Sequence, residues 1–307
     1  MTRRVSDNNA GDAELETSQK LKGIALMVTG TLLFLLLDTF AKKLTQSTPY
    51  LEVVWGRYFF NFVVIVLFVG PRKLPGLLKT NHLKLNLFRG VLLLGATMSF
   101  FGSLVFIPLA TATSIGFVWP LVVTALSVPL LGERVGLPRW TAVTLGFIGA
   151  MIIIRPTAEI AHWAMFLPFS MACFYSLYQI VTRKIDKSES PLTGVLYSSI
   201  IGSILMLLAL PFVWVTPDPQ TWAALAFMGV IATVAHSLFI KALQIAPASL
   251  LAPFAYLQVL ASIFVSWLYF GDQPEPHMIG GAALIVGAGI FVIYRERKKA
   301  YMEPLDV

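Results

Sequence analysis

The sequence contains ten apolar runs, each about as long as a helix that crosses a lipid bilayer. About 20 apolar residues are needed to cross the hydrocarbon core as an α-helix. The runs are continuously apolar, whereas the strands of a membrane barrel alternate between apolar and polar residues. The sequence therefore predicts an all-α integral membrane protein with ten transmembrane helices, near residues 22–42, 51–70, 86–106, 112–131, 138–155, 162–181, 192–215, 221–241, 248–270 and 277–294.

The composition leaves little material for a water-facing surface. Only 13% of the 307 residues are charged and 57% are hydrophobic, whereas a soluble domain carries about 25% charged residues. The polar N-terminus lacks the apolar core of a secretory signal peptide. We therefore expect a disordered cytoplasmic tail at residues 1–21 and a cytoplasmic C-terminal tail at residues 298–307.

The positive charges indicate an orientation in the membrane. With the N-terminus in the cytoplasm, 18 Lys and Arg residues fall in cytoplasmic segments, and only Lys42, Lys43 and Arg155 fall on the opposite side. Arg57 and Arg89 lie in or at the start of spans. Because cytoplasmic loops carry an excess of basic residues, both termini are predicted to be cytoplasmic. The net charge of +7 is explained in the same way and does not indicate nucleic-acid binding.

The two halves of the chain match at a shift of 139 residues. The shared register pairs glycines and a proline, among them Gly90 with Gly229, Pro108 with Pro247 and Gly132 with Gly271. It predicts a duplicated five-helix unit, with repeats at residues 22–156 and 157–297. Because five is odd, the second unit enters the membrane from the opposite side. Inverted repeats of this kind are typical of secondary transporters.

Two related segments carry a resemblance to a known family. They read LLGERVGLPRWTAVTLGFIGAMIIIRP (130–156) and FGDQPEPHMIGGAALIVGAGIFVIYRER (270–297). With TPYLEVVWGR (48–57) and APFAYLQVLASIFVSWLYFGD (252–272), they resemble the EamA family of the drug/metabolite transporter superfamily. The resemblance implies ten helices, cytoplasmic termini and a central cavity lined mainly by spans 1, 3, 4, 6, 8 and 9. It also implies movement of small organic metabolites without ATP hydrolysis.

The motif inventory argues against an enzyme. The sequence has no GxxxxGK[ST], HExxH or CxxC string, so it predicts no ATP hydrolysis, no metal and no cofactor. The alternative is a multispan membrane enzyme that acts on a lipid-linked substrate, which would need a catalytic pair at one membrane face. We expect instead a secondary transporter of the inner membrane that works by alternating access. Its partners would be the bilayer and a small organic solute, which is amino-acid-like, nucleoside-like or flavin-like.

Two charged residues inside spans are candidates for the substrate site. Arg57 lies within span 2, and a buried arginine in a membrane costs about 2.5–3.5 kcal/mol on insertion scales. It could bind a substrate carboxylate, form an ion pair with Asp38 or Glu52, or extend to the interface. Asp38, the sole carboxylate well inside a span, is a candidate to carry a coupling proton.

Polar and aromatic side chains on two further spans complete one face of the expected cavity. Tyr175, Tyr178 and Gln179 share a face of span 6, where they could stack a planar ligand or pack between helices. His236 in span 8 is the second candidate for proton coupling, because imidazole titrates near neutrality. The alternative for His236 is a structural hydrogen bond.

Proline marks spans 4 and 9, which are repeat partners. Trp119-Pro120 interrupts span 4, and Pro253 lies in span 9 close to Tyr256 and Gln258. Broken helices in corresponding positions indicate a transporter site, so Trp119, Tyr256 and Gln258 are predicted to bind substrate, with helix packing as the alternative.

Glycine and alanine residues are predicted to have structural roles in helix packing and at helix ends. Small residues align on one face of span 5 and on one face of span 10 (Gly280, Ala283 and Gly287). Such faces predict close helix contacts, within one chain or in a homodimer. Gly132 and Gly271 are predicted helix C-caps.

Overall fold

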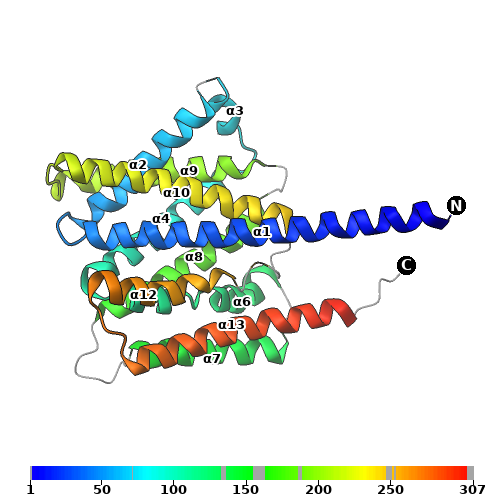
Figure 1. Cartoon of the computed structure of the whole chain (residues 1–307). Coiled ribbons are helices and arrows are strands. Elements are labelled where there is room, and N and C mark those ends of the chain that lie inside the picture. The colour runs from blue at the N-terminus through cyan, green and yellow to red at the C-terminus, as the bar shows by residue number, and fades with distance from the viewer. Residues whose placement is uncertain are drawn as a thin grey trace.

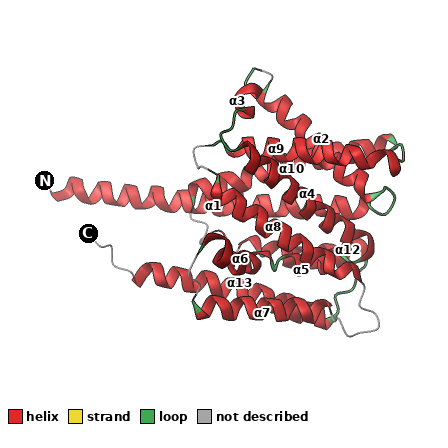
Figure 2. Cartoon of the chain, turned by 180° about the vertical axis from the view of Figure 1, so that it is seen from behind, coloured by secondary structure: helices red, strands yellow, loops and turns green. Residues whose placement is uncertain are grey.

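The computed structural model describes residues 2–70, 72–132, 136–154, 163–185, 189–246, 251 and 254–302. Within these ranges every regular element is a helix, and no strand occurs (Figure 2). The longer helices are α1 (Thr2–Leu44), α2 (Tyr50–Val69), α4 (Leu83–Phe106), α5 (Leu109–Gly116), α6 (Trp119–Leu131), α7 (Leu137–Ile154), α8 (Phe166–Lys184), α9 (Pro191–Ala209), α10 (Pro219–Ile245), α12 (Leu257–Phe270) and α13 (Pro276–Met302). The short ones are α3 (Leu74–Leu78), η1 (Trp163–Met165) and η2 (Leu210–Phe212).

The helices include several that are suited to cross a bilayer. Seven are long and apolar enough, namely Ser18–Leu44, Tyr50–Val69, Leu83–Phe106, Leu109–Leu130, Trp163–Thr182, Leu192–Phe212 and Pro219–Ala242. Three shorter apolar helices cover Trp140–Ile154, Leu257–Phe270 and Pro276–Phe291. The all-helical, multi-pass membrane fold is thereby confirmed, whereas the count of ten spans stays a prediction.

The two chain ends project from the same end of the bundle, which we call the terminal end (Figure 1). Helix α1 begins at Thr2 and extends beyond the bundle there, which differs from the disordered tail expected at residues 1–21. Once a helix is nucleated, each added residue gains one backbone hydrogen bond, so the apolar segment of α1 can propagate its helix into polar sequence. Helix α13 likewise continues to Met302.

The bundle is assembled from closely packed helix pairs. Helix α1 packs along α10, α4 packs along α8, and α2 contacts both α9 and α10, while α7 and α13 form a pair at one edge (Figure 1). The main core lies between α1, α2, α4 and α10, where Leu37, Val53 and Phe101 are almost completely buried. The segment where α5 meets α6 packs mainly against α7, α8, α12 and α13.

The predicted interruption of span 4 is confirmed. Helix α5 ends at Gly116 and α6 begins at Trp119, with a turn at Phe117 and Val118 between them. Pro120 lacks the backbone N–H that would bond to the Gly116 carbonyl, and its ring would clash there. A continuous helix is therefore unfavourable at this point. The corresponding Pro253 lies outside the described residues, and α12 begins at Leu257.

The two predicted glycine C-caps are confirmed. Gly132 ends α6 with a φ of 68°, and Gly271 ends α12 with a φ of 75°. This left-handed backbone conformation is open to glycine without steric cost. The last turns of α6 and α12 therefore end in the same way, as the sequence repeat predicts.

The small-residue faces of α7 and α13 are confirmed only in part. Gly149 of α7 lies against α13, because a Cβ at this position would be 2.8 Å from the Gly281 carbonyl oxygen. On α13, however, Gly280, Ala283 and Gly287 lie on the exposed side, and Gly281 lies in the contact. Among the described residues of one chain, the face of Gly280, Ala283 and Gly287 therefore makes no close helix contact, because the periodicity of small residues does not fix how a helix is rotated. The homodimer stays a prediction.

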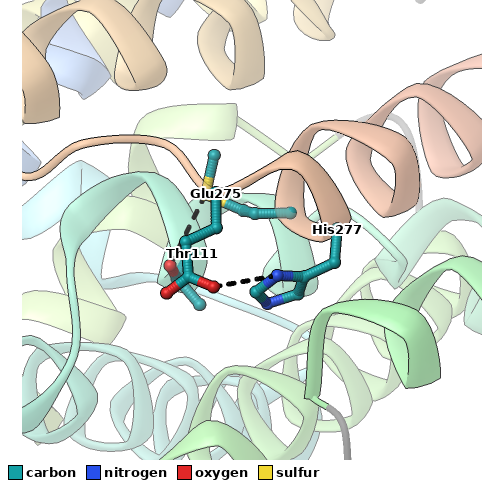
Figure 3. A network of polar contacts seen from close by, with 4 residues as sticks. Thr111, Glu275 and His277 are labelled. Carbon is teal, nitrogen blue, oxygen red and sulfur yellow. Dashed lines mark hydrogen bonds and ion pairs between the residues drawn. The ribbon is translucent and has the colours of Figure 1, made fainter.

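The connection between α12 and α13 holds a small polar cluster at the end opposite the termini (Figure 3). His277 Nδ1 lies 3.1 Å from Glu275 Oε2, and Thr111 Oγ1 lies 3.6 Å from Met278 Sδ. The second contact joins the start of α5 to the start of α13. Neither contact borders the central cavity described below.

Two adjacent glycines of α13 give a matched test of this packing. We expect Gly281→Val to destabilise the protein by about 1–3 kcal/mol, because its Cβ would be 2.6 Å from the Gly149 carbonyl oxygen. Gly280→Val is the control, since nothing lies within 4 Å of a Cβ at that position. Thermal unfolding in detergent should show a lower Tm for Gly281→Val than for Gly280→Val. Equal Tm values would contradict the contact between α7 and α13.

Candidate substrate-binding site

A central cavity lies where the broken segment α5–α6 meets α1, α2, α4, α8, α10 and α12. Apart from α2, these helices correspond to the spans that the resemblance implied. The lining is mainly aromatic and apolar, with a few polar groups. It consists of Thr31, Phe34, Asp38, Arg57, Leu93, Ala96, Thr97, Phe100, Phe101, Thr113, Phe117, Trp119, Met171, Tyr175, His236, Phe239, Ala255 and Gln258.

The carboxylate of the cavity comes from α1. Asp38 is 9% exposed, and its Oδ2 accepts a hydrogen bond of 2.9 Å from Gln258 Nε2. Phe34 and Thr31 share its face of α1, one and two turns earlier respectively. The amide of Gln258 orients the carboxylate but adds no opposite charge to it.

The guanidinium of the cavity comes from α2 and is held by a neutral network. Arg57 Nη1 donates a 2.7 Å hydrogen bond to Thr97 Oγ1. Thr97 in turn donates to the Leu93 carbonyl at 3.0 Å, so the 2.8 Å contact with Tyr58 has the tyrosine hydroxyl as donor. The guanidinium carbon lies 5.6 Å from the ring centroid of Phe101. Arg57 is thereby directed toward α4 and the cavity rather than toward the membrane interface.

The ion pairs considered for Arg57 are not formed in the described part of the chain. No Asp or Glu there lies within the 4.0 Å that defines an ion pair with this guanidinium. Glu52 is fully buried, and its Oε2 accepts a 3.3 Å hydrogen bond from the Val215 backbone N–H. Asp38 faces the same cavity as Arg57 and interacts with it only at longer range. A guanidinium and a carboxyl group therefore line one cavity without direct contact.

Aromatic rings form one wall of the cavity. Trp119 of α6 meets Tyr175 edge to face, with ring centroids 5.0 Å apart. Tyr175 then stacks on Tyr178 at 5.5 Å and an interplanar angle of 21°. The Ser176 hydroxyl, which lies 3.0 Å from the Trp119 carbonyl oxygen and 2.6 Å from that of Ala172, links α8 to the start of α6. A planar ligand could add its own ring to this series.

His236 lies in the cavity as the sequence predicts, and its ring is held on two sides. Its Nδ1 is 2.9 Å from the Ala232 carbonyl oxygen, and its ring meets Phe34 edge to face at 4.8 Å. A carbonyl acceptor requires the proton on Nδ1, which leaves Nε2 as an acceptor in the neutral ring. A coupling role for His236 or Asp38 stays a prediction.

Three predicted site residues lie outside the cavity lining. Tyr178 lines a smaller adjoining pocket together with Arg57 and His236, and the Gln179 side chain lies beside Tyr175. Tyr256 is 4% exposed and packs on Phe117, with a ring distance of 5.7 Å. A Cβ at Gly289 would overlap the Tyr256 hydroxyl, so this side chain reaches α13 instead of the cavity.

Several lining residues were not singled out from the sequence. Phe34, Thr97, Phe101 and Thr113 lie in the cavity, but each is an ordinary residue of an apolar span. Their only sequence signal is the spacing of three or four residues from other lining positions. Thr97 is the most important of them, since it holds Arg57.

Comparison with models of protein families assigns the chain to a family. The model of the EamA-like transporter family matches twice, over residues 21–155 and over residues 162–295. The chain belongs to the EamA-like transporter family. Membership confirms that the protein is a transporter and not an enzyme, and that its partners include a small solute and the membrane.

Characterised relatives of this EamA-like protein carry different substrate names. An S-adenosylmethionine uptake transporter of Rickettsia bellii is 30% identical over 85% of this chain and 89% of its own length. A riboflavin transporter of Vibrio cholerae is 31% identical over 92% of this chain and 96% of its own length. A solved crystal structure, 18% identical, shares the fold with a TM-score of 0.64 over 92% of this chain and 99% of that one.

The network around Arg57 makes a prediction about stability. Thr97→Val keeps the shape of the side chain but removes the acceptor of Arg57 and Tyr58. Losing a buried partner costs about 1–3 kcal/mol, and more for a charged group, so we expect a lower Tm in detergent. Thr141→Val is the control, because Thr141 is exposed and bonds only within α7. An unchanged Tm for Thr97→Val would show that Arg57 is held by other contacts.

Proposed function

We propose that this EamA-like protein carries a zwitterionic, amino-acid-like metabolite with a planar ring, with S-adenosylmethionine as the lead candidate. Transport would occur across the inner membrane by alternating access, without ATP. The observation that carries the proposal is that Asp38 and Arg57 face one cavity without pairing. In an apolar site, each of these charges is favoured by an opposite charge on the ligand.

The amino-acid end of the ligand fits the two charges. A substrate carboxylate can accept two parallel hydrogen bonds from a guanidinium, and Arg57 uses Nη1 for Thr97, which leaves its other N–H groups. A substrate ammonium group can donate to Asp38. Gln258 bonds to Oδ2 of this carboxylate and not to Oδ1. The α-carboxylate and α-ammonium groups of S-adenosylmethionine supply both partners.

The ring end of the ligand fits the aromatic wall. Adenine is planar and can extend the series of Trp119 and Tyr175, and a sulfonium centre is attracted to the faces of aromatic rings. Riboflavin has a larger planar system but no ionised group at neutral pH. It would leave both Asp38 and Arg57 without a charged partner, so the geometry favours the zwitterion.

Two features support alternating access and the orientation. The family model matches each half of the chain separately, as expected for inverted repeats around a central site. Helix α5–α6 is broken beside the cavity, where irregular backbone is tolerated in a membrane. The excess of basic residues on one side favours cytoplasmic termini, so the terminal end of the bundle would face the cytoplasm.

Transport by the purified protein tests the substrate directly. In proteoliposomes without ATP, we expect saturable uptake of radiolabelled S-adenosylmethionine that excess unlabelled S-adenosylmethionine blocks. Excess riboflavin should compete weakly, because it offers no charge to the cavity. Protein-free liposomes give the background. Saturable riboflavin uptake with no S-adenosylmethionine uptake would overturn the proposal and favour a neutral flavin-like substrate.

Charge variants test which ligand group each residue binds. Arg57→Gln should weaken S-adenosylmethionine binding by roughly 10- to 100-fold, the equivalent of about 1.5–3 kcal/mol for a hydrogen bond to a charged group. Its effect should nearly vanish for the decarboxylated analogue, which lacks the carboxylate. Asp38→Asn should weaken binding of both ligands, because both keep a cationic end.

The control for these variants is Lys241→Gln, which removes a charge at an exposed position outside the cavity. Ligand-dependent quenching of Trp119 fluorescence provides the binding signal, and Trp119→Phe identifies it. If Arg57→Gln weakened both ligands equally, Arg57 would not be the carboxylate partner.

A further inference from the structure

The cavity-facing stripe of α4 continues beyond the cavity to a second buried arginine. Leu93, Thr97 and Phe101 line the cavity at intervals of four residues, which places them on one helical face. Arg89 lies four residues before Leu93 on that face and is 7% exposed. Helix α4 begins at the terminal end of the bundle (Figure 1), so Arg89 lies on the terminal side of the cavity.

Residues of α8 and α9 also lie next to Arg89. On α8, the cavity residue Tyr175 is followed by Tyr178, whose ring centroid lies 5.6 Å from the Arg89 guanidinium carbon. On α9, Ser198 lines the adjoining pocket, and Gly194 lies one turn before it. A Cβ at Gly194 would overlap Arg89 Nη2, so the guanidinium packs directly on the α9 backbone. Three helices therefore direct side chains or backbone toward Arg89.

The adjoining pocket extends from Arg57 toward Arg89 and ends at the ring of Tyr178. It is lined by Arg57 and His236 on the cavity side and by Tyr178 on the side of Arg89. Asn61 Oδ1 accepts a 3.0 Å hydrogen bond from Ser199 Oγ within it, so part of its wall is polar. The ring of Tyr178 separates this polar pocket from the Arg89 guanidinium.

Arg89 lacks a matching anion. In the described ranges no Asp or Glu lies within ion-pair distance of it, and its buried Nε has no hydrogen-bond partner. The nearby carboxylate of Glu189 is bonded to Asn86 Nδ2 at 2.8 Å instead. A cation–π contact with Tyr178 orients the guanidinium but supplies no acceptor for its Nε–H.

We propose that Arg89 is a second binding station for the carboxylate of the substrate, reached from Arg57 when the Tyr178 ring moves aside. The carboxylate would pass from one guanidinium to the other along the α4 stripe. From Arg89 it would reach a polar vestibule at the terminal end, lined by residues 76 and 78–83 and by Glu189, Ser190, Thr193 and Tyr197. The inference rests on the proposed function, because it requires a carboxylate on the substrate.

The test measures transport from each side of the membrane. Arg89→Gln should raise the KM for S-adenosylmethionine at least about tenfold from the terminal side only, identified by protease access to an N-terminal tag. The KM from the opposite side should change less than twofold. Arg89→Lys, which keeps the charge but not the planar fork, should give an intermediate KM. Lys84→Gln is the matched control, an exposed charge at the start of the same helix.

The decarboxylated analogue separates binding from a structural role. Its transport should be unaffected by Arg89→Gln, because it has no carboxylate to bind. An equal loss for both compounds would overturn the proposal in favour of a structural contact between α4, α8 and α9. A loss seen only in vesicles with anionic lipids, and absent in phosphatidylcholine, would also overturn it, because the partner would be the net negative charge of a lipid headgroup and not the substrate.

The same assays distinguish failure of this inference from failure of the proposed function. If the wild-type protein does not transport S-adenosylmethionine, the proposed substrate is wrong. If it does, and Arg89→Gln keeps a normal KM from both sides, only the second station is wrong. When Arg89→Gln does not fold, Arg89→Lys decides, because a normal terminal-side KM for this variant contradicts recognition by a planar guanidinium.

Discussion

The architecture of the cavity depends on how Asp38 and Arg57 are held apart inside an apolar bundle. Burying an ionised group without a partner is costly, and a direct pair between Asp38 and Arg57 would be the simplest remedy. Instead each charge is held by a neutral neighbour, Gln258 for the carboxylate and Thr97 for the guanidinium. Neutral hydrogen bonds fix orientation without cancelling charge. The cavity thus has an electrostatic preference that the proposed zwitterion would satisfy at both ends.

The broken segment α5–α6 serves the same cavity. Because Pro120 cannot donate to the Gly116 carbonyl, the helix ends and restarts beside the cavity. Thr113, in the last turn of α5, lines the cavity and has a buried Oγ1 without a hydrogen-bond partner. Such a hydroxyl is suited to a neutral polar atom of the ligand, such as an adenine nitrogen. Charged groups at one part of the cavity and a hydroxyl at another are consistent with a ligand of mixed polarity.

The residues that could be identified from the sequence are those whose type is unusual in its local context. Asp38 and Arg57 were identified because charge within an apolar run is unusual, and Gly132 because a helix end favours glycine. Thr97 was missed because its importance comes from Arg57, which lies 40 residues away in the chain. Tyr256 was placed in the site, yet it reaches Gly289 of α13. Rotation of a helix about its axis is set by packing between helices, and one sequence does not contain it.

One contact on each side of the cavity illustrates how the helices are held together there. At the far end, Lys42 of α1 donates to the carbonyls of Leu104 and Ile107 at 2.7 and 2.9 Å, and these charge-assisted bonds tie α1 to α4. On the terminal side, Tyr178 and Arg89 meet through a cation–π contact, which has no strict hydrogen-bond geometry. Moving a ring across a guanidinium breaks less than withdrawing a lysine from two carbonyls. In the proposed path, passage of the substrate toward the terminal end therefore begins with movement of the Tyr178 ring past the Arg89 guanidinium.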